Sequence, residues 1–600
     1  MIFHHLSSFS CNNITASGHL KIIYFKKHLK KRFLYVKIRY YYLYTHTRIL
    51  RVNWKWRISM QEKFISLLYP SEDSHSFHSY RGNLPDISET VCDELGLTEL
   101  FNLKNSTLSD FFTEDIDVIK YRQATIADML DIPELKATLA EVHPILDDIR
   151  ELRRLDMESS NSGDSYLYSI TEIELYVSCI DMLKRGFEPI RNKIKSPAFS
   201  RLSDFILELA GSEYYAELNK KLTALASRVH EVKSVTIGVN LDRELRPCSA
   251  GVISVNSEQF KSGKTLDKIL RFSFKNDAMT CIAELSPIGS KGQSDNRKEA
   301  LVAAFHSAIE DVFKSSIKGW RAIVGEYVLD NTDFLLKLLP EIEFVAKACD
   351  LITRLKSHPG CSMTVPTVEP KESKTFSAIG LFNPRVALAI DDEIVTNDFI
   401  FDDNARIYVL TGPNRGGKSV ITVAVGAAEA FCMLGLPVPA ESAAISPVDG
   451  IYTHFPEGAD DTIDKGRLGE ECARLREIFD SSTENSMVLL DESLSSTGAY
   501  EAAYIASEIL AGFAVLKTRG IFSTHLHELA ARVPEINEKS KQLGGISIDT
   551  LVAGIEEGKR SFKIVRAKPD GKSYARDIAD KYGLSFESIM AKSRSKEVQS

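Results

Sequence analysis

Apolar and polar residues alternate along the chain in two different ways, and the change comes near residue 375. From about residue 60 to 165 the spacing is mostly helical, and the run Met157 to Asp164, rich in Ser, Asn and Gly, predicts a loop. Residues spaced as on one face of a long helix come next: Leu218, Leu222, Leu225 and Val229. A second helix of this kind is predicted by a later set: Leu301, Phe305, Ile309 and Val312.

Two β-like pieces lie between these helices, at Val235 to Val239 and Gly251 to Val255, and the polar loop Gly289 to Asn296 follows them. A long helix, a small β-containing tip within residues 235–296 and a returning helix together describe an arm. An ordinary helical bundle with a hairpin produces the same pattern, so the sequence leaves both open.

Short apolar strands alternate with helices after residue 375. This pattern is typical of an α/β fold with a mostly parallel sheet and helices on both of its faces. The boundary is predicted within Pro366 to Ser377. The predicted organisation is a mostly α-helical core at 60–165, helical arms with the insert at 166–375 and an α/β domain at 376–570.

Charge is unevenly distributed along the chain. The 600 residues carry a net charge of −8, yet residues 1–59 contain twelve Lys or Arg and no Asp or Glu, which leaves −20 for the rest. This first segment also holds Trp54, Trp56 and the run Tyr40 to Tyr42. It fits a basic arm that touches nucleic acid, an organelle-targeting signal, or a stretch translated upstream of a natural start at Met60. We favour the last, because the chain from Met60 reads like the start of an ordinary soluble protein.

Cysteine usage and hydropathy restrict the compartment. Nine cysteines are scattered without a C-x-x-C pair, which argues against a structural zinc site or a disulfide scaffold and favours a reducing cytosol. Basic residues interrupt the apolar stretches of residues 1–59, and no membrane-spanning run is predicted after residue 60. We expect a cytoplasmic protein with no membrane partner, and organelle targeting by residues 1–59 stays open.

The stretch TGPNRGGKSV, residues 411–420, carries the first candidate chemistry. It follows an apolar strand, precedes a helix-forming run and has the G-x-x-x-x-G-K-S spacing of a phosphate-binding loop. Because backbone N–H groups of such a loop bind phosphate oxygens, the predicted nucleotide contacts are Gly412, Pro413, Asn414, Arg415, Gly416, Gly417, Lys418 and Ser419. Lys418 is expected to reach the β- and γ-phosphates, and the Ser419 hydroxyl to hold Mg²⁺. A glycine-rich turn without a ligand is the alternative.

A second stretch, MVLLDESLSST at 487–497, predicts a buried strand that ends at two carboxylates. In an open α/β sheet, ligands bind at the carboxyl ends of the strands, where a phosphate loop also begins. We therefore predict that Asp491 binds Mg²⁺ and that Glu492 polarises the water that attacks the γ-phosphate. Paired carboxylates often only cap a helix, but here they follow a phosphate loop.

A third strand, in IFSTHLHELA at 521–530, ends at Thr524 and His525. A histidine at that edge can hydrogen-bond the γ-phosphate, so His525 is predicted to be a catalytic phosphate sensor, and His527 is expected to face outward. A lone histidine is more often a surface or core residue, and only its place in this ordered set favours the functional role. No arginine finger is evident in the sequence, which indicates that another subunit completes the site.

TGPNRGGKS, VLLDES and STHLHEL, in this order and spacing, resemble the ATPase domain of the MutS mismatch-repair family, a branch of the ABC-type P-loop ATPases. The stretches IVTNDFIF (394–401), LGLPVPAESA (434–443) and KSYARDIADKYGLS (572–585) resemble that family too. Upstream, DVIKYRQATIADML (117–130) resembles the start of its helical core, and VNLDRELRPCSAGVISVN (239–256) sits where the family carries its clamp.

The resemblance implies that 376–570 is an ATPase domain that uses ATP and Mg²⁺, and that 571–600 is a helical dimerisation segment. It implies that the two long helices are lever arms, with a clamp-like tip, around duplex, mismatched or branched DNA. It also implies a homodimer with shared ATP sites and a cytoplasmic, nucleoid-associated location. DNA repair or recombination is the expected setting.

The chain departs from the family pattern in several places. The stretch between Met60 and the core-like motif is too short for the mismatch-reading and connector domains, so we expect both to be absent. Phe112-Thr113-Glu114 matches the family's Phe-x-Glu wedge by coincidence, because it directly precedes the core segment. In the signature segment GADDTIDKGRLGEECARL, Leu468 and Gly469 replace the usual Ser-Thr that reaches the other subunit's γ-phosphate, and Ser495 stands where Arg is usual.

Three functions remain open from the sequence. The leading one is a MutS-type DNA-binding ATPase whose hydrolysis of ATP opens and closes the arms. The others are a repair protein that itself recognises mismatches, and an ABC-type ATPase that acts as a protein scaffold without DNA. A membrane-transporter motor is disfavoured, since no span is predicted. A basic stripe near the tip, which fits DNA contact or a solvated face, contains Lys261, Lys264, Lys268, Arg271 and Lys275.

Overall fold

The computed structural model describes most of the chain from Phe64 onward. The described ranges are 64–158, 166–230, 234–241, 247–256, 283–285, 333–413, 415–455, 467–556 and 559–568, with isolated residues besides. Several sequence-based predictions lie outside them: the basic segment 1–59, the helix at 301–312, the loop Gly289 to Asn296, the basic stripe 261–275 and nearly all of 571–600. These stay predictions.

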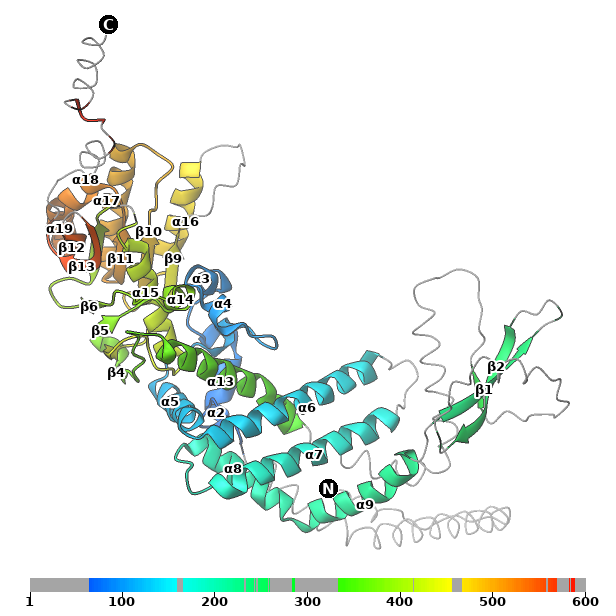
Figure 1. The fold of residues 1–600 in the computed structure, drawn as a ribbon. Coiled ribbons are helices and arrows are strands. Elements are labelled where there is room, and N and C mark those ends of the chain that lie inside the picture. The colour runs from blue at the N-terminus through cyan, green and yellow to red at the C-terminus, as the bar shows by residue number, and fades with distance from the viewer. Residues whose placement is uncertain are drawn as a thin grey trace, which may run out of the picture. The chain divides into compact units, whose positions relative to one another are not determined.

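Helices make up most of the described chain before residue 364. They are α2 (Glu72–Ser79), α3 (Glu89–Glu94), α4 (Leu97–Phe101), α5 (Ile116–Asp131), α6 (Pro133–Glu158), α7 (Tyr166–Ile190), α8 (Pro197–Ala210), α9 (Glu213–His230) and α13 (Asp333–Ser357). Figure 1 shows α6 and α7 side by side. Leu218 and Leu222 of the predicted helical face are buried in α9. Helix α6 extends through Met157 and Glu158, the first two residues of the predicted loop.

Helix α13 packs against α4, α5 and α6, although the sequence assigned it to the arms. Three buried carboxylates hold this helical region together by accepting hydrogen bonds from distant segments. They are Glu341 with the Ser66 hydroxyl and Leu67 N–H, Glu343 with the N–H groups of Lys104 and Asn105, and Asp128 with the N–H groups of Lys195 and Ser196. Helices on both sides of residue 165 thus pack together, and the division predicted there stays a prediction.

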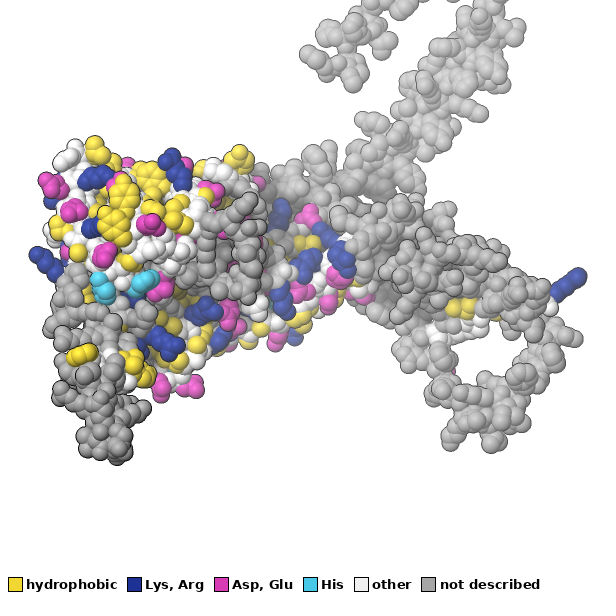
Figure 2. All heavy atoms as spheres, turned by 90° about the horizontal axis from the view of Figure 1, so that it is seen from above, with side chains coloured by type: hydrophobic (Ala, Val, Ile, Leu, Met, Phe, Trp, Pro, Cys, Tyr) yellow, Lys and Arg dark blue, Asp and Glu magenta, His cyan; other side chains and the backbone are white. Residues whose placement is uncertain are grey.

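The surface of the described helices carries charges of both signs. Ion pairs between exposed side chains join Lys136 to Asp350, Lys193 to Glu134 and Arg191 to Asp204, at 2.7–2.8 Å. Figure 2 shows basic and acidic side chains interspersed over one face of the described residues. Solvent screens exposed pairs of this kind, so burial rather than surface charge holds the helices together.

A small separate sheet consists of β1 (Ser234–Leu241), β2 (Pro247–Asn256) and β3 (Ala283–Leu285). Strands β1 and β2 pair antiparallel from Ser234 opposite Asn256 to Leu241 opposite Pro247, and β3 pairs antiparallel with β2. The two predicted β-like pieces are thereby confirmed as paired strands. Their place at the tip of an arm stays a prediction.

A six-stranded sheet forms the centre of the C-terminal domain, in the order β13-β12-β7-β11-β10-β9. Its strands are β7 (Ile407–Thr411), β9 (Ile451–His454), β10 (Met487–Asp491), β11 (Arg519–Ser523), β12 (Ile548–Glu556) and β13 (Lys559–Arg566). All adjacent strands pair in parallel except the edge strand β13, which is antiparallel to β12. The mostly parallel α/β sheet that the sequence predicts is confirmed.

Helices cover both faces of this sheet. On one face, α16 (Arg467–Ser481), α17 (Ala499–Leu516), α18 (His527–Ala531) and α19 (Val533–Gln542) share a core with Val488 and Leu490 of β10. On the other face lies α15 (Lys418–Met433), where a Cβ on Gly426 would meet the Leu489 side chain at 2.6 Å. Successive side chains of a strand point to opposite faces, so residues 488–490 alternate between the two layers.

A second, four-stranded sheet of the C-terminal domain has the order β4-β8-β5-β6. Its strands are β4 (Thr367–Val368), β5 (Phe376–Leu381), β6 (Asn397–Phe401) and β8 (Ser442–Ile445), with the short helix α14 (Pro384–Ala389) between β5 and β6. Because β4 pairs with β8, the domain already includes Thr367. Strand β4 lies inside the predicted boundary stretch Pro366 to Ser377, and the domain limit at residue 376 stays a prediction.

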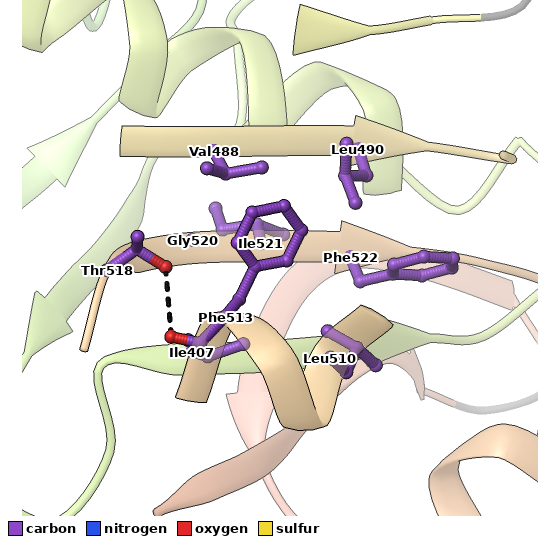
Figure 3. A pocket seen from close by; sticks show the side chains of 9 residues that line it. All are labelled: Ile407, Val488, Leu490, Leu510, Phe513, Thr518, Gly520, Ile521 and Phe522. Carbon is purple, nitrogen blue, oxygen red and sulfur yellow. Dashed lines mark hydrogen bonds between the residues drawn. The ribbon is translucent and has the colours of Figure 1, made fainter. Parts of the chain in front are cut away.

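Helix α17 is the one described helix that is long and apolar enough to cross a membrane. Its apolar side nevertheless belongs to the core, where Ala502, Ala506 and Leu510 are buried against the sheet. A cavity of about 10 Å³ lies between α17 and the sheet. Leu510, Phe513 and residues of three strands line it (Figure 3). A space this small and apolar cannot hold a nucleotide, so the candidate site is expected at the sheet edge instead.

Candidate functional site

The predicted phosphate loop joins β7 to α15. Every residue of β7 is buried, and α15 begins at Lys418. Gly412 and Gly417 have φ angles of 139° and 95°, which residues with a Cβ rarely adopt. A Cβ on Gly412 would also lie 2.7 Å from the Cβ of Ala553 on β12. Backbone conformation and close packing thus explain why glycine occupies these positions.

The other predicted loop residues differ in exposure. Pro413 and Gly416 are buried, Arg415 and Ser419 are exposed, and Asn414 lies outside the described residues. Ser419 is the second residue of α15, so its backbone N–H belongs to the first turn, where the N–H groups of a helix have no partner within it. Donors of this kind bind anions readily.

The Lys418 side chain is only 4% exposed and folds back onto its own loop. Its Nζ donates to the carbonyl oxygens of Gly412 at 3.2 Å and Pro413 at 3.3 Å. Burial lowers the pKa of Lys418, and the nearby carboxylates of Glu492 and Asp491 oppose this shift. An ammonium held by neutral carbonyl oxygens can exchange them for phosphate oxygens.

Asp491 ends β10 and is 4% exposed. Burial raises the pKa of Asp491, while hydrogen bonding from the Ser419 hydroxyl opposes the shift. Ser523, its register partner on β11, lies close enough to lower this pKa further, yet Asp491 Oδ1 and Ser523 Oγ have no well-formed hydrogen bond among the described residues. A buried carboxylate oxygen without a partner is costly, so this position fits a missing ligand.

These side chains fit a magnesium ion. Among the described residues, no three His, Cys, Asp or Glu side chains form a metal cluster. Mg²⁺ is usually held by one or two carboxylates together with substrate phosphates and water. The unsatisfied Asp491 oxygen and the Ser419 hydroxyl beside it match that chemistry, whereas a site built wholly from protein ligands does not.

The chain turns sharply after Asp491. Glu492 and Leu494 have φ angles of 48° and 65°, in the left-handed region that non-glycine residues rarely adopt. The Glu492 N–H donates to the Ser523 carbonyl at 2.8 Å, and the Leu494 side chain is fully buried. Such conformations persist only where surrounding contacts hold them, and they cluster at functional sites. The turn thus places Glu492 at the sheet edge beside Lys418, whose pKa its charge affects.

The end of β11 lies at the same edge. The Thr524 N–H donates to the Leu410 carbonyl at 2.9 Å, which holds the end of β11 against β7. His525 follows with an exposed side chain, and His527 at the start of α18 is exposed as expected. His525 is therefore accessible to a ligand at this edge, and its role as a phosphate sensor stays a prediction.

The structure describes several of the residues at which the chain departs from the family pattern. Leu468 packs partly against the core, and a Cβ on Gly469 would meet nothing within 4 Å. Ser495 is exposed. Phe112 is fully buried, so it cannot be an exposed wedge. The signature segment before residue 467 lies outside the described residues.

Sequence reasoning missed two contributors to this edge. His454 ends β9, and its Nδ1 lies 2.8 Å from the Ser493 Oγ. The β12–β13 pair lies over the phosphate loop, because Ala553 packs at Gly412 and Phe562 at Gly417. His454 resembles Asp491 in being the last residue of a strand, but β9 (IYTH) lacks the apolar run that marks β10. No pattern in the residues around Ala553 indicates that it contacts the phosphate loop.

Comparison with known proteins covers both parts of the chain. The family model described as MutS domain V matches residues 408–597, and the model described as MutS2 N-terminal domain matches residues 114–358. DNA mismatch repair protein MutS 1 of Haloarcula marismortui is 32% identical over 197 residues, which are 32% of this chain and 21% of that protein. DNA mismatch repair protein MutS of Prochlorococcus marinus strain MIT 9312 is 32% identical over 169 residues, 28% of this chain and 18% of that protein.

The aligned part of the chain thus spans about a fifth of each of these relatives. The domain V match begins within β7 and includes the phosphate loop, Asp491, Glu492 and His525. The MutS2 N-terminal match begins just before α5 and runs through α13, the helices that the buried carboxylates connect. Two matches of one family, in the order expected and over both structural regions, establish that the chain belongs to the MutS family.

Proposed function

We propose that the chain is a Mg²⁺-dependent ATPase. One observation carries this proposal: a glycine loop with a buried lysine lies at the same sheet edge as a buried aspartate with an unpartnered oxygen. Lys418 and the loop N–H groups bind the phosphates, and Ser419 and Asp491 hold the metal ion, which supplies neutralisation of phosphate charge. Glu492 orients the attacking water and accepts its proton, and His525 contacts the γ-phosphate.

Helix α15 supports coupling between the nucleotide and the helical region. Its first turn belongs to the phosphate loop, and at its last residue the Met433 carbonyl accepts the Thr113 N–H at 3.2 Å. Just beyond, a Cβ on Gly435 would lie 2.4 Å from the Cβ of Arg122 on α5. One rigid helix thus contacts the nucleotide loop at one end and the helical core at the other. In this proposal ATP binding moves the helical arms through α15.

We further propose that the chain binds duplex, mismatched or branched DNA as a homodimer with shared ATP sites. The names of the relatives, DNA mismatch repair proteins, support DNA as the partner. Charges of both signs are interspersed on the face in Figure 2, so a broad basic surface does not cover the described residues there. Contacts to phosphates by a few residues, together with DNA shape, fit this surface better than base readout.

Glu492→Gln tests the ATPase assignment. We expect ATP affinity close to that of the parent and hydrolysis slower by about 10²–10³-fold, because the base is lost while the phosphate contacts remain. Glu538→Gln, at an exposed position of α19, is the matched control and should hydrolyse ATP at the parent rate. Parent-rate hydrolysis by Glu492→Gln contradicts the role of this residue.

Gel-shift titrations with homoduplex, mismatched and junction DNA at low salt test the DNA assignment. Binding to one or more of them, altered by ATP, is the expected result. A strong preference for mismatched DNA favours a mismatch-recognising protein, which the names of the relatives also support. Active ATP hydrolysis with no binding to any of the three contradicts the DNA proposal and favours a scaffold.

A further inference from the structure

A hydrogen bond links the turn after Asp491 to the neighbouring strand β9. The Ser493 Oγ lies 2.8 Å from His454 Nδ1 and 3.3 Å from the His454 carbonyl oxygen. Both side chains are buried, with 3% of Ser493 and 6% of His454 exposed. His454 pairs in register with Leu490, one residue before Asp491, so the contact spans the last rung of the β9–β10 ladder.

The arrangement allows the Ser493 hydroxyl both to accept and to donate a hydrogen bond. The His454 Nδ1–H can donate to Oγ while the hydroxyl donates to the His454 carbonyl. Ser493 sits between Glu492 and Leu494, the two residues in left-handed backbone conformation. A side chain fixed between two strained residues restricts how the whole turn can relax.

A second link holds the far end of the same turn. The Ser496 hydroxyl donates to the Glu471 carboxylate on α16 at 3.0 Å. Helix α16 is itself tied to the end of β9, since Arg474 donates to the Thr453 carbonyl at 3.3 Å, and to α3 by the Arg474–Glu94 ion pair. β9, which precedes the signature segment, and α16, which contains the second half of that segment, thus both hold the turn that carries Glu492.

We propose that His454 is a positioning residue for Glu492: through Ser493 it fixes the left-handed turn from which the Glu492 carboxylate reaches the nucleotide. The inference rests on the proposed ATPase function, because it assigns a role in that reaction. His454 itself touches no reacting atom. It acts by limiting the positions of Glu492, and small errors in the placement of a reacting group can slow a reaction by up to about 100-fold.

The first test measures backbone exchange and needs no nucleotide. Amide hydrogen exchange is compared in the parent, His454→Leu, Ser493→Ala and His454→Asn, whose amide can donate as Nδ1 does. We expect peptides covering residues 491–496 to exchange faster in the first two variants and at the parent rate in His454→Asn. Parent-like exchange of these peptides in both His454→Leu and Ser493→Ala overturns the proposal, whatever the ATPase activity.

The second test separates hydrolysis from binding. Single-turnover hydrolysis is expected to fall about 10- to 100-fold in His454→Leu and Ser493→Ala, with ATP affinity within about 3-fold of the parent. The double variant should be no slower than the slower single one, since both changes break one contact. Rescue by His454→Asn is expected as well. Equal losses of affinity and rate, or additive losses in the double variant, contradict the positioning role.

Ser486→Ala is the matched control. Ser486 precedes the other end of β10, is fully buried, and its hydroxyl donates to Asp449 Oδ1 at 2.7 Å. Its loss removes a comparable buried hydrogen bond away from Glu492, so it should lower stability and leave the hydrolysis rate unchanged. A parent that hydrolyses no ATP refutes the proposed function, while the exchange experiment still decides whether His454 holds the turn.

Discussion

Buried carboxylates occur in both the helical region and the nucleotide domain, but they are surrounded differently. In the helical region, Glu341, Glu343 and Asp128 each accept hydrogen bonds from segments far away in sequence. In the nucleotide domain, Asp491 Oδ1 has no well-formed hydrogen bond among the described residues, and neither does the adjacent Ser523 hydroxyl. The first set is saturated by the fold, whereas Asp491 retains capacity for a ligand.

This difference distinguishes buried carboxylates that stabilise the fold from buried carboxylates that can bind a ligand. A carboxylate that accepts backbone N–H groups stabilises the fold, because those donors would otherwise be buried without partners. A carboxylate with an unpartnered oxygen costs stability, which a protein retains only where another property requires it. Glu429 of α15 is a different case: both of its oxygens lack well-formed hydrogen bonds among the described residues, although the backbone of Val448 lies close enough to lower its pKa, and Arg519 lies 3.9 Å away with both side chains fully buried. A buried carboxylate with a countercharge nearby in the core, such as Glu429, therefore differs from one at the open edge of a sheet, such as Asp491.

The largest expected effect is on stability in the helical region. Asp128→Ala removes the acceptor for the Lys195 and Ser196 N–H groups and leaves them buried without a partner. We expect a loss of about 3–5 kcal/mol, measured by thermal or urea unfolding, because several hydrogen bonds to a charged group are lost together. A loss of unfolding free energy below about 1 kcal/mol would show that a full set of hydrogen bonds does not identify a carboxylate that stabilises the fold.

The next effect is a dependence of stability on pH. Burial raises the pKa of Glu341 to about 7, so the folded state holds its proton more tightly than the unfolded state. The stability from this protonation is full below about pH 4.5 and is lost as pH rises to about 7, a change of about 3 kcal/mol. Glu341→Gln cannot titrate, so the stability difference between parent and variant should shrink over this range. A difference independent of pH contradicts the raised pKa.

A smaller effect is expected on nucleotide affinity. Lys418→Ala should weaken ATP binding about 10- to 100-fold, because a hydrogen bond to a charged group contributes about 1.5–3 kcal/mol. Equilibrium titration with a fluorescent ATP analogue measures it. Lys539→Ala, an exposed lysine of α19 whose ion pair is with Glu508, is the matched control and should bind as the parent does. Equal affinity of both variants contradicts the phosphate role of Lys418.

The smallest effect has the opposite sign. Asp491→Asn should raise the stability of the ligand-free protein by about 0.5–2 kcal/mol, since it removes a buried charge whose pKa burial already raises. The thermal midpoint without nucleotide or metal measures this change. A clear loss of stability would place Asp491 with Asp128, as a carboxylate that the fold itself requires.

The sequence predicted the features that neighbouring residues determine. Strand, glycine loop and helix follow one another around Gly412, and Asp491 ends an apolar run, so their common edge follows from parallel pairing alone. The β1–β2 pieces were predicted for the same reason. Contacts between distant segments could not be read in this way: Glu341 bonds to a residue 274 positions away, and Ala553 packs on Gly412 from a strand after the last motif. His454 also ends a strand at the predicted edge, but Tyr452 and Thr453 interrupt the apolar pattern that would have indicated it.

Magnesium binding by Asp491 can be tested by calorimetric titration of ATP into the parent and into Asp491→Asn, each with and without Mg²⁺. If the unpartnered oxygen at the sheet edge is the metal ligand, Mg²⁺ strengthens ATP binding to the parent and has little effect on Asp491→Asn. Absence of ATP binding to the parent in the presence of Mg²⁺, or an equal effect of Mg²⁺ on both proteins, contradicts this assignment.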